Sequence, residues 1–249
     1  MFLARRFQRS ISFQTSAQAE AALDLLRVQP YIDEAFIDRD YRLEHAMYGC
    51  QPYRMSEPPG FEAVFHLGFR QDLLGASILQ QPLIATFFTL LEKAYGLDPP
   101  PYDGAPYLTV PDEPPGEHVV FQGFGQSLMD HLPAEARTRL ADFWRRLLAG
   151  IGREVVIVTA EADRDFYRDF DGRLVCPRGL LETARLIRSA KCFLGVQSAA
   201  AAVADGLKAP RIVFHWFRNA DPSGPNGLTF ALDASPDELL AAARARLGI

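Results

Sequence analysis

Short apolar runs and amphipathic segments follow one another through the second half of the chain. Runs rich in Val, Ile and Phe, such as 153–160, are typical of buried strands. Between them, apolar residues recur at helical spacing, as in 132–152, which ends in a glycine. Strand and helix alternate about six times, which predicts a parallel, doubly wound sheet. The predicted strands are 117–125, 153–160, 172–176, 191–196, 211–216 and 228–232, and the predicted helices are 132–152, 161–170, 178–190, 198–207 and 235–249.

The first half of the chain is less regular. The pattern predicts strands over 10–16, 34–38 and 61–69, and helices over 17–29 and 76–97. Seven prolines lie in 98–117. Proline lacks a backbone donor, so this segment cannot continue the interior of a sheet, and we interpret it as a semi-rigid connector. The predicted organisation is an N-terminal α/β lobe (1–97), the connector (98–117) and a C-terminal Rossmann-like lobe (118–249).

The composition fits a water-soluble globular protein, with 48% hydrophobic and 23% charged residues. The net charge is −5 and no dense Lys/Arg block occurs, which argues against nucleic acid as a partner. No apolar run is long enough to span a membrane. The three arginines within residues 1–10 fit a solvated chain end, and peripheral contact with an anionic membrane surface is the alternative.

Cysteine spacing gives no indication of a metal site. Cys50, Cys176 and Cys192 share no metal-ligand spacing, and the last two lie in or beside apolar runs. We therefore expect buried thiols and a reducing, cytoplasmic location.

The turn after the strand 191–196 is the first candidate binding site. Ligands of doubly wound sheets bind beyond the carboxyl ends of the strands, where helix N-termini offer unpaired N–H groups. Gln197, Ser198 and Ala199 occupy such a position, and the small side chains there, those of Ser198 and Ala199, would let a phosphate approach the backbone. The alternative is that Ser198 is a simple N-cap and that the alanines are small because the helix packs closely.

The loop after the strand 117–125 is the second candidate. Gly123, Gly125, Gln126 and Ser127 could form a phosphate or sugar loop. Their pattern is not a full dinucleotide fingerprint, so a plain turn is the alternative.

Four further residues are weaker candidates. Arg178 could pair with phosphate and Glu182 could accept ribose hydroxyls, although a first-turn glutamate also complements the helix dipole without a ligand. His215 ends a predicted core strand, where it would contact a ligand or make a buried hydrogen bond. Asp72 is a candidate for the base that deprotonates an acceptor hydroxyl.

Several of these stretches resemble the heptosyltransferase-like glycosyltransferases of family nine. Residues 180–213, LLETARLIRSAKCFLGVQSAAAAVADGLKAPRIV, are similar to its C-terminal lobe, with a helix, a strand, a polar turn, an Ala-rich helix and Gly-x-x-x-Pro. VVIVTAEADRDF (155–166) looks like the preceding strand and turn. DLLRVQPYIDEAFI (24–37) and EKAYGLDPPPYDGAPYLTV (92–110) are similar to stretches of its N-terminal lobe.

The resemblance implies an α/β fold of two Rossmann-like lobes (GT-B-like), here with a short or incomplete N-terminal lobe. It further implies a nucleotide-sugar donor held mainly by the C-terminal lobe, a glycan or lipid-linked acceptor, and no cofactor. Two departures bear on activity. The family's early Gly-x-Gly-Asp turn, which carries a catalytic carboxylate, does not occur near Met1, and its Asp-Ser/Thr-Gly-x-x-His turn is replaced by 197–202, QSAAAA. The sequence therefore predicts a glycosyltransferase, with a catalytically inactive binding or assembly module as the alternative.

Overall fold

The computed structural model describes residues 2–8, 11–39, 83–100, 104–125, 132–215, 227–231 and 236–248 of the chain. Two units are distinguished by their internal contacts, one of residues 1–105 with 219–221 and one of 106–218 with 222–249. The boundary after Ala105 lies inside the segment 98–117 that we interpret as a connector, and its connecting role stays a prediction. Each unit is described by itself below.

A parallel sheet forms the centre of the C-terminal unit. Its strand order is β5-β4-β3-β6-β7-β8, and every neighbouring pair is parallel. Counted from β3, this is the 3-2-1-4-5-6 order of dinucleotide-binding folds, in which the winding direction reverses between the first and fourth strands. The prediction of a doubly wound sheet is confirmed. The strands are β3 (Val119–Gln122), β4 (Val155–Val158), β5 (Arg173–Val175), β6 (Cys192–Val196), β7 (Arg211–His215) and β8 (Gly227–Ala231).

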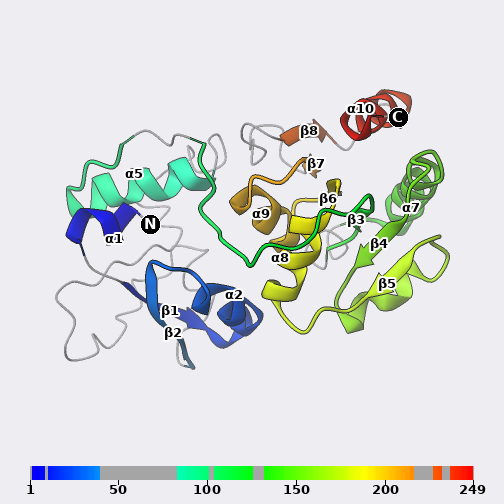
Figure 1. The fold of residues 1–249 in the computed structure, drawn as a ribbon. Coiled ribbons are helices and arrows are strands. Elements are labelled where there is room, and N and C mark those ends of the chain that lie inside the picture. The colour runs from blue at the N-terminus through cyan, green and yellow to red at the C-terminus, as the bar shows by residue number, and fades with distance from the viewer. Residues whose placement is uncertain are drawn as a thin grey trace. The chain divides into compact units, whose positions relative to one another are not determined.

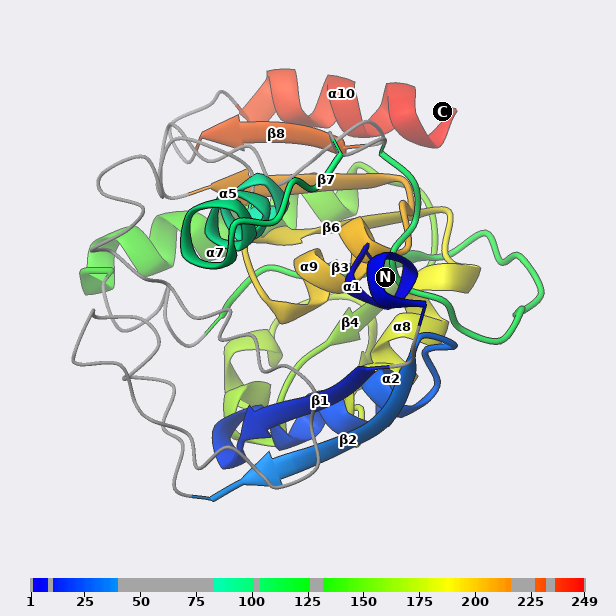
Figure 2. The ribbon, with the colours of Figure 1, turned by 90° about the vertical axis from the view of Figure 1, so that its left-hand side faces the viewer.

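Helices cover both faces of this sheet, as Figure 1 shows, with α8 and α9 on one face and α7 and α10 on the other. Phe121 of β3 shares a core cluster with Trp144 of α7 and Tyr167 of η3. Alternate residues of a strand point to the same face, and Phe121 points to the face that these two side chains cover. Pro236 opens α10, as the sequence predicts. The helical elements are α7 (Ala134–Ala149), η3 (Glu161–Tyr167, a 3-10 helix), α8 (Leu180–Ser189), α9 (Ala199–Gly206) and α10 (Pro236–Leu247). Figure 2 shows α10 running alongside β8.

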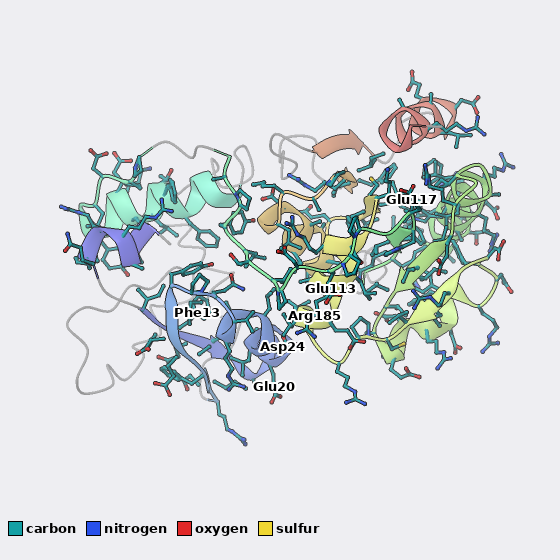
Figure 3. The ribbon with its side chains drawn as sticks, in the orientation of Figure 1. Phe13, Glu20, Asp24, Glu113, Glu117 and Arg185 are labelled. Carbon is teal, nitrogen blue, oxygen red and sulfur yellow. The ribbon has the colours of Figure 1, made fainter. Side chains whose placement is uncertain are left out.

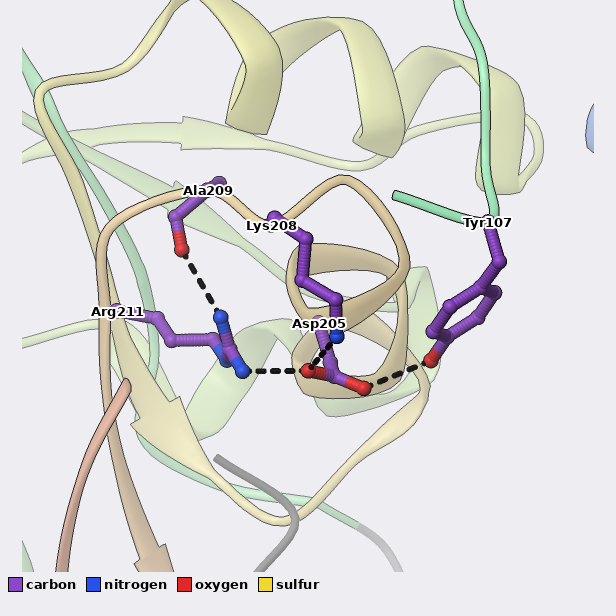
Figure 4. A network of polar contacts seen from close by, with 5 residues as sticks. All are labelled: Tyr107, Asp205, Lys208, Ala209 and Arg211. Carbon is purple, nitrogen blue, oxygen red and sulfur yellow. Dashed lines mark hydrogen bonds and ion pairs between the residues drawn. The ribbon is translucent and has the colours of Figure 1, made fainter. Parts of the chain in front are cut away.

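A buried ion network lies at the end of the sheet where the strands begin. The Asp205 carboxylate, near the end of α9, accepts hydrogen bonds from Lys208 at 2.8 Å and from Arg211 at the start of β7 (Figure 4). The Tyr107 hydroxyl donates to the other Asp205 oxygen at 2.8 Å. Arg211 is fully buried, so this carboxylate compensates a charge that would otherwise be costly to bury.

The segment 106–117 is packed along the same end of the unit. Its backbone is bonded at both ends, since Leu108 N–H donates to the Gly206 carbonyl at 3.0 Å and Gly116 N–H to the Ser189 carbonyl at 2.7 Å. Between these bonds, Glu113 lies 3.8 Å from Arg185 of α8, and Figure 3 shows the pair pointing toward one another. The second part of the proline-rich segment is therefore fixed to the C-terminal unit.

The N-terminal unit contains a strand–helix–strand arrangement. Strand β1 pairs with β2 in parallel, so the predicted strands over 10–16 and 34–38 are confirmed. The predicted single helix over 17–29 is instead a 3-10 helix over 17–22 followed by a short α-helix over 23–27. Leu23, Ile32 and Ala35 form its small core. Gly96 adopts a left-handed φ of 61° and ends α5, with its N–H donating to the Glu92 carbonyl. Its elements are α1 (Phe2–Phe7), β1 (Ile11–Ser16), η1 (Ala17–Ala22), α2 (Leu23–Arg27), β2 (Ile32–Asp38) and α5 (Leu83–Tyr95). The predicted strand 61–69 and the start of the helix 76–97 lie outside the described residues.

No helix among the described residues has the length and hydropathy needed to cross a bilayer. The thiol predictions are confirmed in part. Cys192 is buried, but Cys176 is only half-buried because it follows the short strand β5 at the margin of the sheet. Cys50 lies outside the described residues.

Candidate functional site

The two candidate loops lie side by side where the winding of the C-terminal sheet reverses. Strands β3 and β6 are neighbours, with Gln122 opposite Gly195 in the ladder. A Cβ on Gly195 would stand 2.6 Å from the Gln122 carbonyl oxygen, so glycine lets the two strands approach closely here. A Cβ built on Gly125 would lie 3.9 Å from Val196 of β6. Residues 123–125 and 197–199 therefore lie on either side of the point where β3 and β6 end. We call this point the β3–β6 crevice, and sheets of this kind usually bind their ligands there.

Ser198 is an N-cap, as the sequence predicts. Its extended backbone precedes α9, and its Oγ accepts the Ala201 N–H at 3.2 Å. The N–H groups of Ala199 and Ala200 open the helix and have no intrahelical acceptor. Ala199 is exposed, so its N–H group lies at the surface, at the positive end of the helix dipole. This arrangement suits an anion, although the cap alone also explains Ser198.

The two glycines of the β3 loop differ in their surroundings. At Gly123 a Cβ would overlap the Phe121 ring and stand 2.8 Å from Trp144 Nε1, so packing alone requires glycine. The Trp144 indole also donates to the Gly123 carbonyl at 2.9 Å. At Gly125 the only neighbour of a Cβ within 4 Å among the described residues is Val196, at 3.9 Å, so this position could accommodate a further atom. Of the two, only Gly125 leaves room for a ligand, and Gln126 and Ser127 lie outside the described residues.

Arg178 and Glu182 lie at the same end of the sheet, after β5 and two strands away from β3. The Glu182 carboxylate, in the first turn of α8, accepts at 3.0 Å the backbone N–H of Arg178, the residue before the N-cap Gly179. This bond favours the interpretation that Glu182 stabilises the start of its helix without a ligand. The Arg178 side chain is exposed, and its binding of phosphate stays a prediction.

The remaining candidates are placed only in part. His215 ends β7, next to β6, and pairs with Ala231, but its side chain lies outside the description. Asp72 also falls outside the described residues. Among the residues that the structure describes, no three His, Cys, Asp or Glu side chains are grouped so as to hold a metal ion.

Glu161 is a site candidate that the sequence interpretation missed. It opens η3 beyond the carboxyl end of β4, the second strand of the 3-2-1-4-5-6 order, where dinucleotide-binding folds place the acid that binds ribose. A hydrogen bond with the Cys176 thiol, and then Arg164 at 3.1 Å, lower the pKa of this exposed carboxyl. Burial, and then Glu161, raise the pKa of the thiol. The available signal was an acid directly after the run VVIVTA.

Comparison with known proteins gives likenesses in structure alone. No family model matches the sequence, and no curated protein matches it. The ADP-heptose LPS heptosyltransferase II of E. coli superposes with a TM-score of 0.64 at 17% identity, over 99% of this chain and 92% of that chain. A glycosyl transferase family 9 protein from Veillonella parvula DSM 2008 has a TM-score of 0.62 at 12% identity, over 99% and 90%.

The E. coli heptosyltransferase WaaC with ADP is similar with a TM-score of 0.50 at 18% identity. The match covers 67% of this chain and spans 57% of the length of WaaC. At such identities these likenesses show the fold. The chain has the α/β, Rossmann-like fold of heptosyltransferase-like, GT-B glycosyltransferases, as the resemblance in the sequence implies.

Proposed function

We propose that the protein is a glycosyltransferase whose C-terminal unit binds a nucleotide-sugar donor in the β3–β6 crevice. The observation that carries the proposal is the reversal of strand order between two uncharged loops, 123–125 and 197–199, which contain Gly123, Gly125, Ser198 and Ala199. The structural likeness to an ADP-heptose heptosyltransferase supports it, as does the likeness to a heptosyltransferase that was determined with ADP.

The diphosphate of the donor would bind at the N-terminus of α9. The N–H groups of Ala199 and Ala200 donate to phosphate oxygens there, and the helix dipole favours the negative charge. Gly125 leaves space for the phosphates to approach. Because charge develops on the diphosphate as the sugar departs, preorganised donors at this position stabilise the transition state.

The rest of the donor would extend along the carboxyl ends of the neighbouring strands. Glu161, at the end of β4, would accept hydrogen bonds from the ribose hydroxyls. The exposed Arg178 side chain would neutralise charge on the phosphates. His215, at the end of β7, would border the sugar.

The transferred sugar would pass to a hydroxyl of a glycan, glycoconjugate or lipid-linked acceptor. The bond between the anomeric carbon and the diphosphate oxygen breaks, a bond to the acceptor oxygen forms, and the hydroxyl proton passes to a general base. Asp72 is our candidate for that base. We propose that no metal ion takes part, which predicts that EDTA leaves turnover unchanged.

Binding of ADP and other nucleoside diphosphates, measured by calorimetry and thermal shift, tests the proposal. At a ligand concentration of one hundred Kd, binding to the folded state alone stabilises it by about 2.7 kcal/mol. A folded protein that shows no shift with any nucleoside diphosphate would contradict donor binding.

A matched pair of variants tests the location of the site. Asp and Asn both cap helices well, so Ser198→Asp and Ser198→Asn should keep the stability of α9. The Asp carboxylate would repel the diphosphate and lower ADP affinity by about tenfold or more, which corresponds to about 1.4 kcal/mol. The Asn variant should bind within about threefold of wild type. Equal affinities of the two variants would place the diphosphate elsewhere.

A catalytically inactive binding or assembly module is the second candidate function. The observation that favours it is the turn 197–202, which carries alanines where the resembling family has glycine and histidine. A protein that binds nucleotide sugars tightly but neither transfers nor hydrolyses any of them over long incubation would support this alternative. Release of nucleoside diphosphate that depends on an added acceptor would exclude it.

A further inference from the structure

Two buried aromatic side chains hold the backbone of the β3 loop through hydrogen bonds. The Tyr167 hydroxyl accepts the Phe124 N–H at 2.9 Å and lies 3.3 Å from the Phe124 carbonyl oxygen, to which it donates. The Trp144 indole donates to the Gly123 carbonyl at 2.9 Å. Both side chains belong to the core on the α7 face of the sheet. Three backbone groups of a three-residue loop are thus bonded from the protein interior.

These bonds determine which loop groups can face a ligand. Because the Phe124 N–H is bonded to Tyr167, it is not available to an anion in the β3–β6 crevice. The next donor along the loop is the N–H of Gly125, which has no bonded acceptor among the described residues. A Cβ added at Gly125 would meet only Val196 among those residues, at 3.9 Å. The Tyr167 hydroxyl therefore determines the direction in which the Gly125 N–H points.

The position of the hydroxyl is itself constrained. The Tyr167 ring packs against the rings of Phe124, Phe170 and Phe121, with centroid distances of 5.2, 5.6 and 6.1 Å. The Tyr167 hydroxyl is neutral at neutral pH and can both donate and accept, and burial raises its pKa further above the ordinary range. A rigid, neutral hydroxyl is suited to hold a loop in one conformation.

We propose that Tyr167, assisted by Trp144, is a positioning residue of the donor site. It orients the loop 123–125 so that the N–H of Gly125 points into the crevice toward the donor diphosphate. This inference rests on the proposed function, and it assigns a role in binding to a core residue that does not touch the ligand.

Tyr167→Phe tests this inference, with Tyr107→Phe as its matched control. Each change removes one hydroxyl from a partly or fully buried tyrosine and keeps the ring, but Tyr107 bonds to Asp205 at the opposite edge of the sheet. Both variants should lose stability to urea. Only Tyr167→Phe should weaken ADP binding, by about five- to tenfold in calorimetry, since a lost hydrogen bond frees the loop.

The outcomes separate the inference from the function on which it rests. Wild-type protein that binds no nucleoside diphosphate would overturn both. Wild-type protein that binds ADP, together with a Tyr167→Phe variant of equal affinity, would overturn the positioning role and leave the donor site standing. Equal losses of affinity in both tyrosine variants would also overturn it, because general destabilisation would then explain the effect.

Amide hydrogen exchange in wild-type protein provides a second measurement that does not depend on a variant folding. The Phe124 amide should be protected from exchange without ligand, and its exchange rate should not change when ADP is added. ADP should slow exchange of the Gly125 amide. Protection of Phe124 that arises only when ADP is added would overturn the inference, because the amide would then bond to the ligand rather than to Tyr167.

Discussion

The two edges of the C-terminal sheet differ in how their polar groups are satisfied. At the edge where the strands begin, Glu117 pairs with Arg153 and lies 3.4 Å from Lys191, and Asp205 bonds to Arg211. At the edge where β3 and β6 end, the loop residues 123–125 and 197–199 carry no charge. The strand starts contain their own counter-charges, whereas the loops after β3 and β6 present backbone donors and no charged side chain. The Glu161–Arg164 ion pair at this edge lies beyond β4.

The difference follows from what each edge has to do. Charges and polar groups taken out of water must find partners, and the strand starts find them within the protein, including the segment 106–117. A binding edge needs the opposite arrangement, because donors already bonded to protein cannot serve a ligand. The β3 loop combines both, since the Phe124 N–H is bonded to Tyr167 whereas the Gly125 N–H has no bonded acceptor among the described residues.

The largest expected effect comes from disrupting the ion network of Asp205, at the edge where the strands begin. Asp205→Asn leaves the fully buried Arg211 without its carboxylate and should lower the free energy of unfolding by about 3–5 kcal/mol. Urea denaturation measures the loss. ADP affinity should stay unchanged in the folded variant, because the network lies at the other edge. A loss below about 1 kcal/mol would show that the pair is effectively exposed.

A smaller effect is expected from substituting the two glycines of the loop after β3. Gly123→Ala should destabilise by about 1–3 kcal/mol, because its Cβ would overlap the Phe121 ring and crowd Trp144. Gly125→Ala, its control, should change stability by about 0.5 kcal/mol or less. The same denaturation experiment compares them. Equal destabilisation of the two variants would contradict the open surroundings of Gly125.

The smallest effect concerns how stability depends on pH through Glu117, at the edge where the strands begin. The hydrogen bond from Arg153, and then the charge of Lys191, lower the pKa of the Glu117 carboxyl below its ordinary 4.5. A lowered pKa means that the carboxylate stabilises the fold at neutral pH and that this contribution disappears as the pH falls through the lowered value.

Glu117→Gln provides the measurement for this prediction. The variant should be slightly less stable than wild type at neutral pH, and the difference should vanish in acid and shrink at high salt, since the carboxylate is exposed. A difference that persists unchanged below the titration range would point to a role other than charge.

Much of the C-terminal unit could be predicted from local patterns. Ser198 caps α9 and Pro236 begins α10 because capping depends on neighbouring residues only. The bond from Tyr167 to Phe124 spans 43 positions, and no local pattern indicates it. The position of Glu161 at the proposed ribose site likewise depends on β4 being second in the 3-2-1-4-5-6 order, which only strand pairing establishes.

The sequence by itself determined which segments form strands and helices, where several of the helices begin, and that small uncharged residues follow β3 and β6. Periodicity and capping act over a few residues, so they can be read along the chain. Only the tertiary structure decided that 123–125 and 197–199 meet at one crevice, that Phe124 is bonded inward and Gly125 is left open, and that 106–117 belongs to the C-terminal unit. These outcomes depend on which strands pair and which side chains share the core, and both are settled by packing between segments far apart in the sequence.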